Sequence, residues 1–246
     1  MRIGAVRSLA DTAVTLEMAT SVGLEASAKV SAALGAIEQA MASGALPGVS
    51  EVAAAFCSVT VHYDCLQITQ SDLADRLTGL LGKVAPTERP EGRSWLLPCC
   101  YHPELGLDLA SLSEALSLDP DRIVALHQAT TFHVYALGFL PGLPFLGDLP
   151  PDLARPRRTE PRLRVPAGSV AIANRMCVIY PWNSPGGWHI VGRCPVPLFD
   201  ITCDVPALLA AGDSIRFKPI TREEFRDLDR DLRASGGSRD AFRVAC

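Results

Sequence analysis

Hydrophobic residues near the start of the chain recur first at the spacing of a strand and then at that of a helix. Val14, Leu16 and Met18 alternate with polar residues, which places the three side chains on one face of a strand. Between Glu25 and Ala42 the apolar residues recur at helical spacing, and a Pro-Gly turn follows. The pattern therefore predicts a strand followed by an amphipathic helix.

The same order is repeated in the next part of the chain. Val52–Tyr63 has the alternation of one strand or two, and a second helix begins near a cap at Thr69 or Ser71 and ends before Pro86. This β-α-β-α order predicts a small two-layer α/β domain over residues 1–90, with its helices on one face of a sheet.

Short strand patterns between glycine and proline turns dominate the rest of the chain. After a first strand at Trp95–Tyr101, we expect two helices, one capped by Asp108 and running through Leu116, and one that begins at Asp119-Pro120. The strands expected after them are Phe132–Leu137, Val170–Ile172, Cys177–Tyr180, His189–Gly192, Pro197–Phe199 and Ser214–Phe217. Such repeated short strands predict a closed or nearly closed sheet, a β-barrel over residues 91–220.

Polar segments without periodicity separate these parts. Thr87–Ser94 carries Pro and Gly and is expected to be the boundary between the domains. Residues 221–246 are expected to form an exposed helix over Thr221–Arg233 and an unstructured tail from Ser235.

Composition narrows the classes of function. The chain has 246 residues and a net charge of −4, which argues against nucleic-acid binding because phosphate recognition needs a basic surface. No segment approaches the ~20 apolar residues of a membrane span, so a cytoplasmic protein is expected. The eight cysteines contain no CxxC pair, so we expect reduced thiols and no metal site.

One short stretch is strongly basic. Within it a single acid, Glu160, accompanies five arginines. They are Arg155, Arg157, Arg158, Arg162 and Arg164. Guanidinium groups bind carboxylates and phosphates through two parallel hydrogen bonds, so the run indicates a site for an anion. A solvated basic loop that pairs with acids of a partner is the alternative for any single arginine.

Four stretches of this half resemble a known family. They are GFLPGLPFLG at 138–147, PRRTEPRLRVPAGSV at 156–170, VIYPWNSPGGW at 178–188 and IVGRCPVPLFD at 190–200. In this order they resemble allophanate hydrolase subunit 1, also called the 5-oxoprolinase B subunit or the KipI-type kinase inhibitor. The sequence departs from the family at Phe145, where tyrosine is usual, and at Cys194, where threonine is usual.

The resemblance implies an α+β protein in which a cyclophilin-like β-barrel follows the small α/β domain. It implies the B subunit of an ATP-dependent 5-oxoprolinase that opens 5-oxo-L-proline to L-glutamate. The partners implied are a larger C subunit, similar to allophanate hydrolase subunit 2, and an A subunit. Two alternatives remain: an inhibitor of a sensor histidine kinase, and a carboxyltransferase or allophanate-hydrolase-type subunit that acts on a urea-like substrate.

Site residues follow from the matched motifs. Arg157, Arg162 and Arg193 match the family pattern and are expected to bind the anion, while His127 is the candidate proton carrier, although a structural histidine is the commoner case. The other candidates for substrate or anion binding are Gly138, Pro141, Gly142, Phe145, Gly168, Ser169, Tyr180, Ser184, Gly186, Gly187 and Trp188. Without a P-loop motif, ATP with Mg²⁺ is expected at a site completed by the partner.

Overall fold

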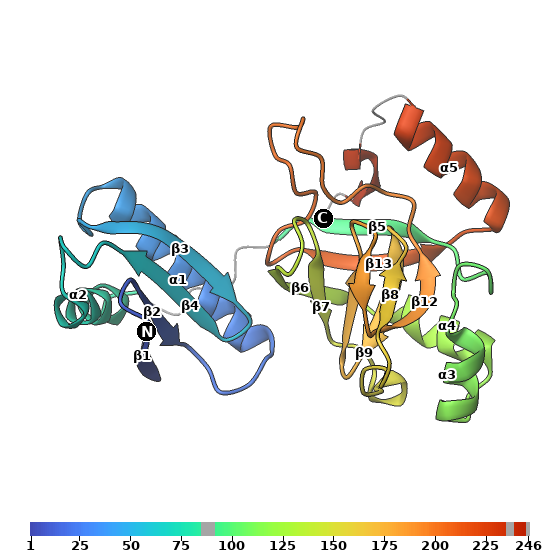
Figure 1. Cartoon of the computed structure of the whole chain (residues 1–246), viewed down its shortest axis with the longest axis horizontal. Helices are drawn as coiled ribbons and strands as arrows, with labels where there is room; N and C mark the ends of the chain where they lie inside the picture. Colours follow the sequence, from blue (N-terminus) through green and yellow to red (C-terminus); the bar gives the residue numbers. More distant parts are fainter. Residues whose placement is uncertain (85–91, 235–238, 245–246) are drawn as a thin grey trace. The chain divides into compact units, whose positions relative to one another are not determined.

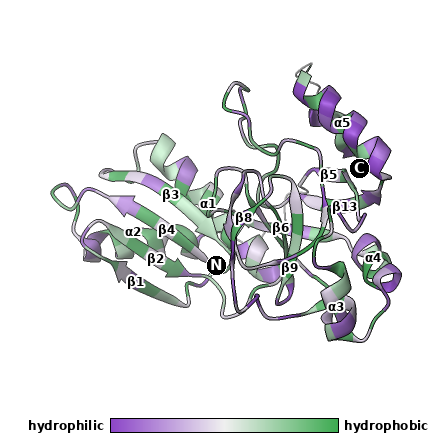
Figure 2. Ribbon diagram, turned by 45° about the vertical axis from the view of Figure 1, so that its right-hand side comes forward, coloured by the Kyte–Doolittle hydropathy of each residue, from purple (hydrophilic) through white to green (hydrophobic). Residues whose placement is uncertain are grey.

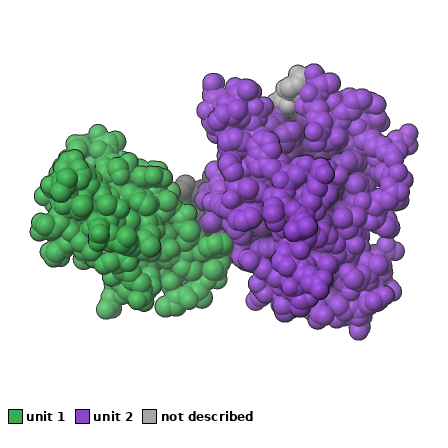
Figure 3. Space-filling model, viewed as in Figure 1, with its two compact units in different colours: residues 1–91 green, residues 92–246 purple. Residues whose placement is uncertain are grey.

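The computed structural model describes residues 1–84, 92–234 and 239–244, which form two units. Unit 1 is Met1–Glu91 and unit 2 is Gly92–Cys246 (Figure 1; the units have separate colours in Figure 3). Most of the boundary segment expected at Thr87–Ser94 lies outside the described residues. The tail expected to be unstructured from Ser235 is corrected over residues 239–244, which form η2 (Arg239–Phe242) and β14 (Arg243–Val244), because β14 pairs with the strand at Ser94–Cys99.

Unit 1 is a four-stranded antiparallel sheet with two helices. Its elements are β1 (Ala5–Leu9), β2 (Ala13–Glu17), α1 (Leu24–Ala42), β3 (Val49–Ala55), β4 (Ser58–Tyr63) and α2 (Gln70–Gly82). The strand order is β1-β2-β4-β3. The segment expected as one strand or two is two strands, because Phe56 adopts a positive φ of 43° in the tight turn between them.

The alternation in β4 positions the core of unit 1. Val59, Val61 and Tyr63 are buried and share one hydrophobic cluster with Ile37 of α1 and Leu77 of α2. These side chains come from both layers, so burial of the amphipathic helix faces holds the unit together.

Caps fix the start of two helices. At α2 the Thr69 hydroxyl accepts a hydrogen bond from the Asp72 N–H at 3.2 Å, so the predicted cap is confirmed. At α5 (Arg222–Ala234) Thr221 and Glu224 form a reciprocal capping box, in which each backbone N–H donates to the other side chain.

Unit 2 is built on an eight-stranded sheet. In spatial order its strands are β12 (His189–Arg193), β9 (Ser169–Ala173), β10 (Met176–Ile179), β7 (Pro144–Gly147), β6 (Phe132–Leu137), β13 (Ser214–Pro219), β5 (Ser94–Cys99) and β14 (Arg243–Val244). A separate pair is formed by β11 (Ser184–Gly186) and β8 (Arg162–Val165). The helices and short 3₁₀ turns are α3 (Leu109–Leu116), α4 (Pro120–Ala129), α5, η1 (Pro151–Leu153) and η2 (Arg239–Phe242).

The eight-stranded sheet curls back on itself without closing as a continuous ladder. Cys100, just after β5, forms an isolated bridge with Arg193 at the end of β12. Both backbone hydrogen bonds of this bridge are 2.9 Å long. The mixture of sheets and helices confirms the predicted α+β class, whereas a closed barrel of paired strands is not formed by the described residues.

One predicted strand is wrong. Pro197–Phe199 is not a strand, since only Phe199 pairs, in a single bridge with Ala207. Proline at positions 195 and 197 removes backbone donors that a ladder would need.

The outer surface of unit 2 is more polar than its sheet. Figure 2 shows α5 mostly in the hydrophilic colour, with only Phe225 of this helix buried. Among the described residues, no helix combines the length and apolar character needed to span a bilayer.

Candidate functional site

A cavity of about 140 Å³ opens in unit 2 beside the loop that joins β6 to β7. The motif stretches 138–147, 156–170 and 178–188, which are separate in sequence, all contribute residues to its lining. Its walls include the rings of Phe145 and Trp188, whose centroids lie 6.2 Å apart. The fold therefore gathers the motif loops around one small, largely aromatic space.

Backbone conformation shapes the mouth of the cavity. Phe139 and Gly142 adopt positive φ values of 68° and 77° in the β6–β7 loop, and the Phe139 side chain is 72% exposed. A Cβ atom at Gly142 would lie 2.8 Å from Cβ of Phe199, so only glycine permits this close approach. Gly142 thus serves the packing of the loop and does not line the cavity.

Arg157 is the cation of this cavity. Its guanidinium carbon lies 5.4 Å from the centroid of the Trp188 ring, within the range of a cation–π interaction. No carboxylate among the described residues forms an ion pair with Arg157. The sequence prediction placed an anion-binding arginine here, and the geometry leaves this guanidinium available for one.

Two buried residues with side-chain donors, Tyr180 and Trp188, line the same cavity. Tyr180 is 3% exposed and Trp188 is 7% exposed, and neither side-chain donor has a hydrogen-bond acceptor within the described part of the chain. Burial raises the pKa of the Tyr180 hydroxyl, while the Arg157 guanidinium opposes that shift, so the phenol is protonated at neutral pH. A Cβ atom at Gly186 would approach the Tyr180 hydroxyl oxygen more closely than van der Waals contact allows, so glycine is needed at that position.

Arg162 does not line the cavity. Its guanidinium forms two hydrogen bonds to the carboxylate of Asp108, at 2.7 and 2.9 Å, and Arg158 adds a third at 3.0 Å. The Ile190 N–H also donates to this carboxylate, at 2.7 Å. The structure thus pairs Arg162 with a buried acid of the protein, and its anion-binding role stays a prediction.

Sequence reasoning missed the role of Asp108. The side chain was expected to cap α3, but it makes no capping hydrogen bond and is only 2% exposed. It instead anchors the segment between Arg158 and Arg162 to the start of α3. No signal short of three-dimensional contact identifies this pairing, because the partners are 50 and 54 residues apart.

Arg193 also makes contacts within the folded protein. Its Nε donates to the Ala167 carbonyl at 2.8 Å, and its guanidinium carbon lies 5.8 Å from the Phe225 ring centroid. Burial lowers the pKa of this guanidinium. The predicted role in anion binding is not supported, because Arg193 lies between the 166–168 turn and α5 and not at the cavity.

Four further predicted residues have structural contacts. Gly168 has a positive φ of 79°, and a Cβ atom there would overlap the Cys194 carbonyl oxygen. The Gly138 N–H donates to the Leu143 carbonyl at 3.1 Å, Ser169 is buried on β9, and the Ser184 hydroxyl donates to the Pro185 carbonyl at 3.3 Å.

The remaining glycine and proline candidates differ in position. Gly187 lines the cavity, and its carbonyl accepts a hydrogen bond from the Arg158 N–H at 2.7 Å. Pro141 is exposed in the β6–β7 turn and does not line the cavity.

His127 is buried away from the cavity. Its Nδ1 lies 2.9 Å from the Tyr101 hydroxyl, its Nε2 lies 3.5 Å from the Cys177 sulfur, and its ring packs against Phe132 and Phe217. Burial lowers the pKa of His127 to about 3. The ring is therefore neutral at physiological pH, and the geometry argues against the predicted role as a proton carrier.

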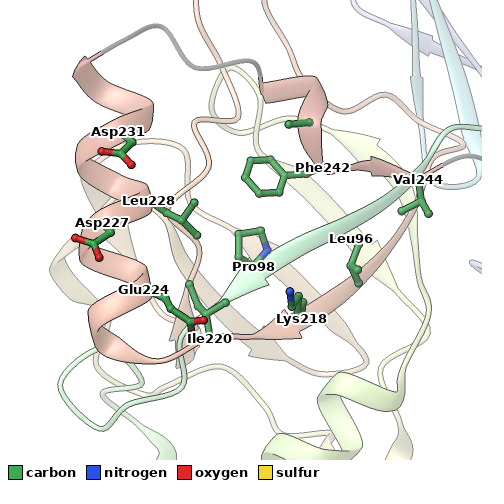
Figure 4. A pocket seen from close by; sticks show the side chains of 11 residues that line it. Leu96, Pro98, Lys218, Ile220, Glu224, Asp227, Leu228, Asp231, Phe242 and Val244 are labelled. Atoms are coloured by element: carbon green, nitrogen blue, oxygen red, sulfur yellow. The ribbon is translucent and has the colours of Figure 1, made fainter.

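A larger cavity of about 530 Å³ lies beneath α5 (Figure 4). Glu224, Asp227 and Asp231 of the helix line one side, with Phe242 and Val244 opposite. Glu224 accepts a hydrogen bond from the Thr221 N–H at the helix cap, and Arg230 pairs with Asp227 at 2.7 Å and with Asp231 at 3.5 Å. The three acids of the helix therefore already have partners. This space was not predicted and lacks the free guanidinium of the smaller cavity.

Metal-ligating groups of three or more His, Cys, Asp or Glu side chains are absent from the described residues.

Comparison with known proteins covers most of the chain. Residues 5–209 match the family "Carboxyltransferase domain, subdomain C and D". The 5-oxoprolinase B subunit of Bacillus subtilis (strain 168) is 32% identical over 234 residues, which are 89% of this chain and 94% of that protein. The protein of the same name from Escherichia coli O157:H7 is 39% identical over 174 residues, or 71% and 79% of the two chains.

A solved structure shares the same fold over both parts of the chain. The crystal structure of TTHA0988 is 33% identical, with a TM-score of 0.72 and coverage of 88% of this chain. The match spans only 40% of TTHA0988, so that protein contains a large region outside the shared fold.

Proposed function

Because this chain belongs to the carboxyltransferase subdomain C and D family, together with proteins named as the 5-oxoprolinase B subunit, we propose that it is the B subunit of an ATP-dependent 5-oxoprolinase. In this proposal the complex opens 5-oxo-L-proline to L-glutamate. The other members are a larger C subunit, similar to allophanate hydrolase subunit 2, and an A subunit. The shared name of the relatives supports membership of a hydrolase complex.

One observation about this chain supports the proposal most strongly. Three of the motif stretches that carry the family resemblance converge on the same cavity, which holds the unpaired guanidinium of Arg157 and the hydroxyl of Tyr180. A guanidinium and a neutral hydrogen-bond donor beside apolar walls suit a small substrate with one carboxylate and one amide carbonyl.

ATP does not fit the cavity that holds Arg157. The cavity has about 140 Å³ of space and one free guanidinium, which is too little to enclose a nucleotide triphosphate with its Mg²⁺. No glycine-rich P-loop occurs in the sequence. We therefore propose that ATP binds at a site completed by a partner protein, and we assign no step of phosphoryl chemistry to this chain.

Reconstitution tests the proposed function. The purified chain is mixed with the A and C subunits of the same organism, and consumption of 5-oxoproline and release of ADP are measured together. We expect both to require all three proteins, with ATP hydrolysis dependent on 5-oxoproline. The matched control omits only this chain. Equal activity without it, or no activity in the full mixture, contradicts the proposal.

A further inference from the structure

Three residues that line the 140 Å³ cavity carry side-chain donors without an acceptor in the described part of the protein. They are the Arg157 guanidinium, the Tyr180 hydroxyl and the Trp188 indole N–H. Tyr180 and Trp188 are at most 7% exposed. Buried donors without partners are rare in folded proteins because water is lost without replacement, so this arrangement indicates a ligand that supplies acceptors.

The charge and walls of the cavity define that ligand. Arg157 is the one charged residue of the lining, and the described lining contains no carboxylate. Leu143, Val178 and the aromatic rings of Phe145 and Trp188 supply apolar surface around it. The cavity is thus matched to a small monoanion with a compact apolar ring.

We infer that this cavity binds 5-oxoproline itself, an inference that rests on the proposed function. Arg157 pairs with the carboxylate, the Tyr180 hydroxyl donates to the lactam carbonyl oxygen, and the ring lies against Trp188. This places the substrate site on this chain before any partner protein is added. Tyr180 and Arg157 are then binding residues that set specificity for a cyclic amide with one carboxylate.

The same chemistry accounts for discrimination against the product. Glutamate carries a second carboxylate and an ammonium group, and the described lining offers no second cation and no acid for them. A charge placed against Phe145 and Val178 without a partner is costly to desolvate. The site therefore retains the closed lactam and releases the opened product.

Calorimetric titration of the purified chain, without partners or ATP, tests this assignment. Three probes separate the contacts: 5-oxoproline carries both groups, 2-pyrrolidinone lacks the carboxylate, and cyclopentanecarboxylate lacks the amide. We expect saturable binding of 5-oxoproline and weaker binding of the other two. Glutamate is expected to bind at least about tenfold more weakly, since its second carboxylate and its ammonium group find no partner in the described lining.

Variants assign each contact to its residue. Arg157→Ala is expected to raise the dissociation constant of 5-oxoproline by about 10- to 100-fold, and Tyr180→Phe by about 3- to 10-fold. Binding of 2-pyrrolidinone stays insensitive to Arg157→Ala, and binding of cyclopentanecarboxylate stays insensitive to Tyr180→Phe. Arg164→Ala, at an exposed position of the same basic run that does not line the cavity, is the matched control and leaves all three affinities unchanged.

The outcomes separate this inference from the proposed function. If the isolated chain does not bind 5-oxoproline, or if Arg157→Ala and Tyr180→Phe bind it like Arg164→Ala, the inference is overturned even when the full complex hydrolyses 5-oxoproline. If binding follows the predicted pattern while the reconstituted complex is inactive, the site stands and the proposed function fails.

Discussion

Arg157 and Arg162 belong to the same basic run, yet their contacts in the folded protein differ. Arg162 is held by two hydrogen bonds to the buried carboxylate of Asp108, whereas Arg157 stands exposed at the cavity over the Trp188 ring. The difference comes from a carboxylate 54 residues away from Arg162 in the chain. A cluster of like charges in a sequence can therefore contain both structural ions and ligand-binding ions.

The same contrast extends to the other polar groups of unit 2. Tyr180 and Trp188 face the cavity with donors that have no acceptor in the described structure, while His127 and Arg193 have contacts within the fold. Groups of the first kind are expected to matter for ligand binding, and groups of the second kind for stability. The distinction would fail if substitution of a cavity residue mainly lowered stability, or if substitution of His127 or Arg193 mainly weakened ligand binding.

Loss of Asp108 is expected to have the largest effect. Asp108→Ala leaves two arginines and the Ile190 N–H without their acceptor, and we expect a loss of about 3–5 kcal/mol in the free energy of unfolding. Urea unfolding measures the change, with Asp152→Ala at an exposed position as control. A loss below about 1 kcal/mol would show that the pairs contribute as little as exposed ion pairs do.

His127 gives the next largest effect, through pH. Its pKa is about 3 in the folded state against 6.5 for a free histidine, so the unfolded chain binds the proton first as the pH falls. The contribution of His127 is complete above about pH 6.5 and is lost progressively as the pH falls towards 3, with a loss of about 2–3 kcal/mol by about pH 4.5.

Two measurements check this dependence. The free energy of unfolding is compared at several pH values between the wild type and His127→Gln, and the difference between them should shrink as the pH falls. The NMR signal of the His127 ring should also show no titration above about pH 4.5. Titration near pH 6.5 would mean that the ring is accessible and would restore it as a candidate proton carrier.

Removal of Arg162 is expected to cost less than loss of the acid, because Arg158 and the Ile190 N–H remain bonded to Asp108. Arg162→Ala should lower the free energy of unfolding by about 2 kcal/mol, the size of a hydrogen-bonded pair with a charged group. Thermal unfolding measures it. A change no larger than that of Arg164→Ala would place Arg162 among the weakly paired surface arginines.

The smallest effect on stability is expected at the cavity. Arg157→Ala removes an exposed guanidinium with no ion pair among the described residues, so the free energy of unfolding should change by no more than about 0.5 kcal/mol. Denaturant unfolding in the absence of ligand provides the value. A loss comparable with that of Arg162→Ala would remove the contrast between the two arginines.

Sequence patterns predicted the elements whose signals are local. The alternation of Val59, Val61 and Tyr63, the cap at Thr69 and the strand at Phe132–Leu137 all depend on neighbouring residues, and the structure contains each of them. The strand at β1 (Ala5–Leu9) was not predicted, because four of its five residues are exposed and carry no strong apolar pattern.

Only the part of the site that depends on local sequence could be predicted. Matched motifs indicated the loops around the cavity, including Tyr180 and Trp188, since glycine and proline mark tight turns in the sequence. Arg157 differs in role from Arg162 and Arg193 because the latter two contact residues distant in sequence, Asp108 and Phe225. Such pairings are made by the tertiary fold and leave no local signature.

The indole N–H signals of the three tryptophans offer the most direct test of the cavity as the ligand site. Trp188 lines the cavity, whereas the indole of Trp95 donates to Asp213 at 3.0 Å and Trp182 packs against Phe199. During titration of ¹⁵N-labelled protein with 5-oxoproline, the Trp188 signal should shift and saturate while that of Trp95 stays in place. A Trp188 signal that does not move, or equal shifts of all three, would contradict the account.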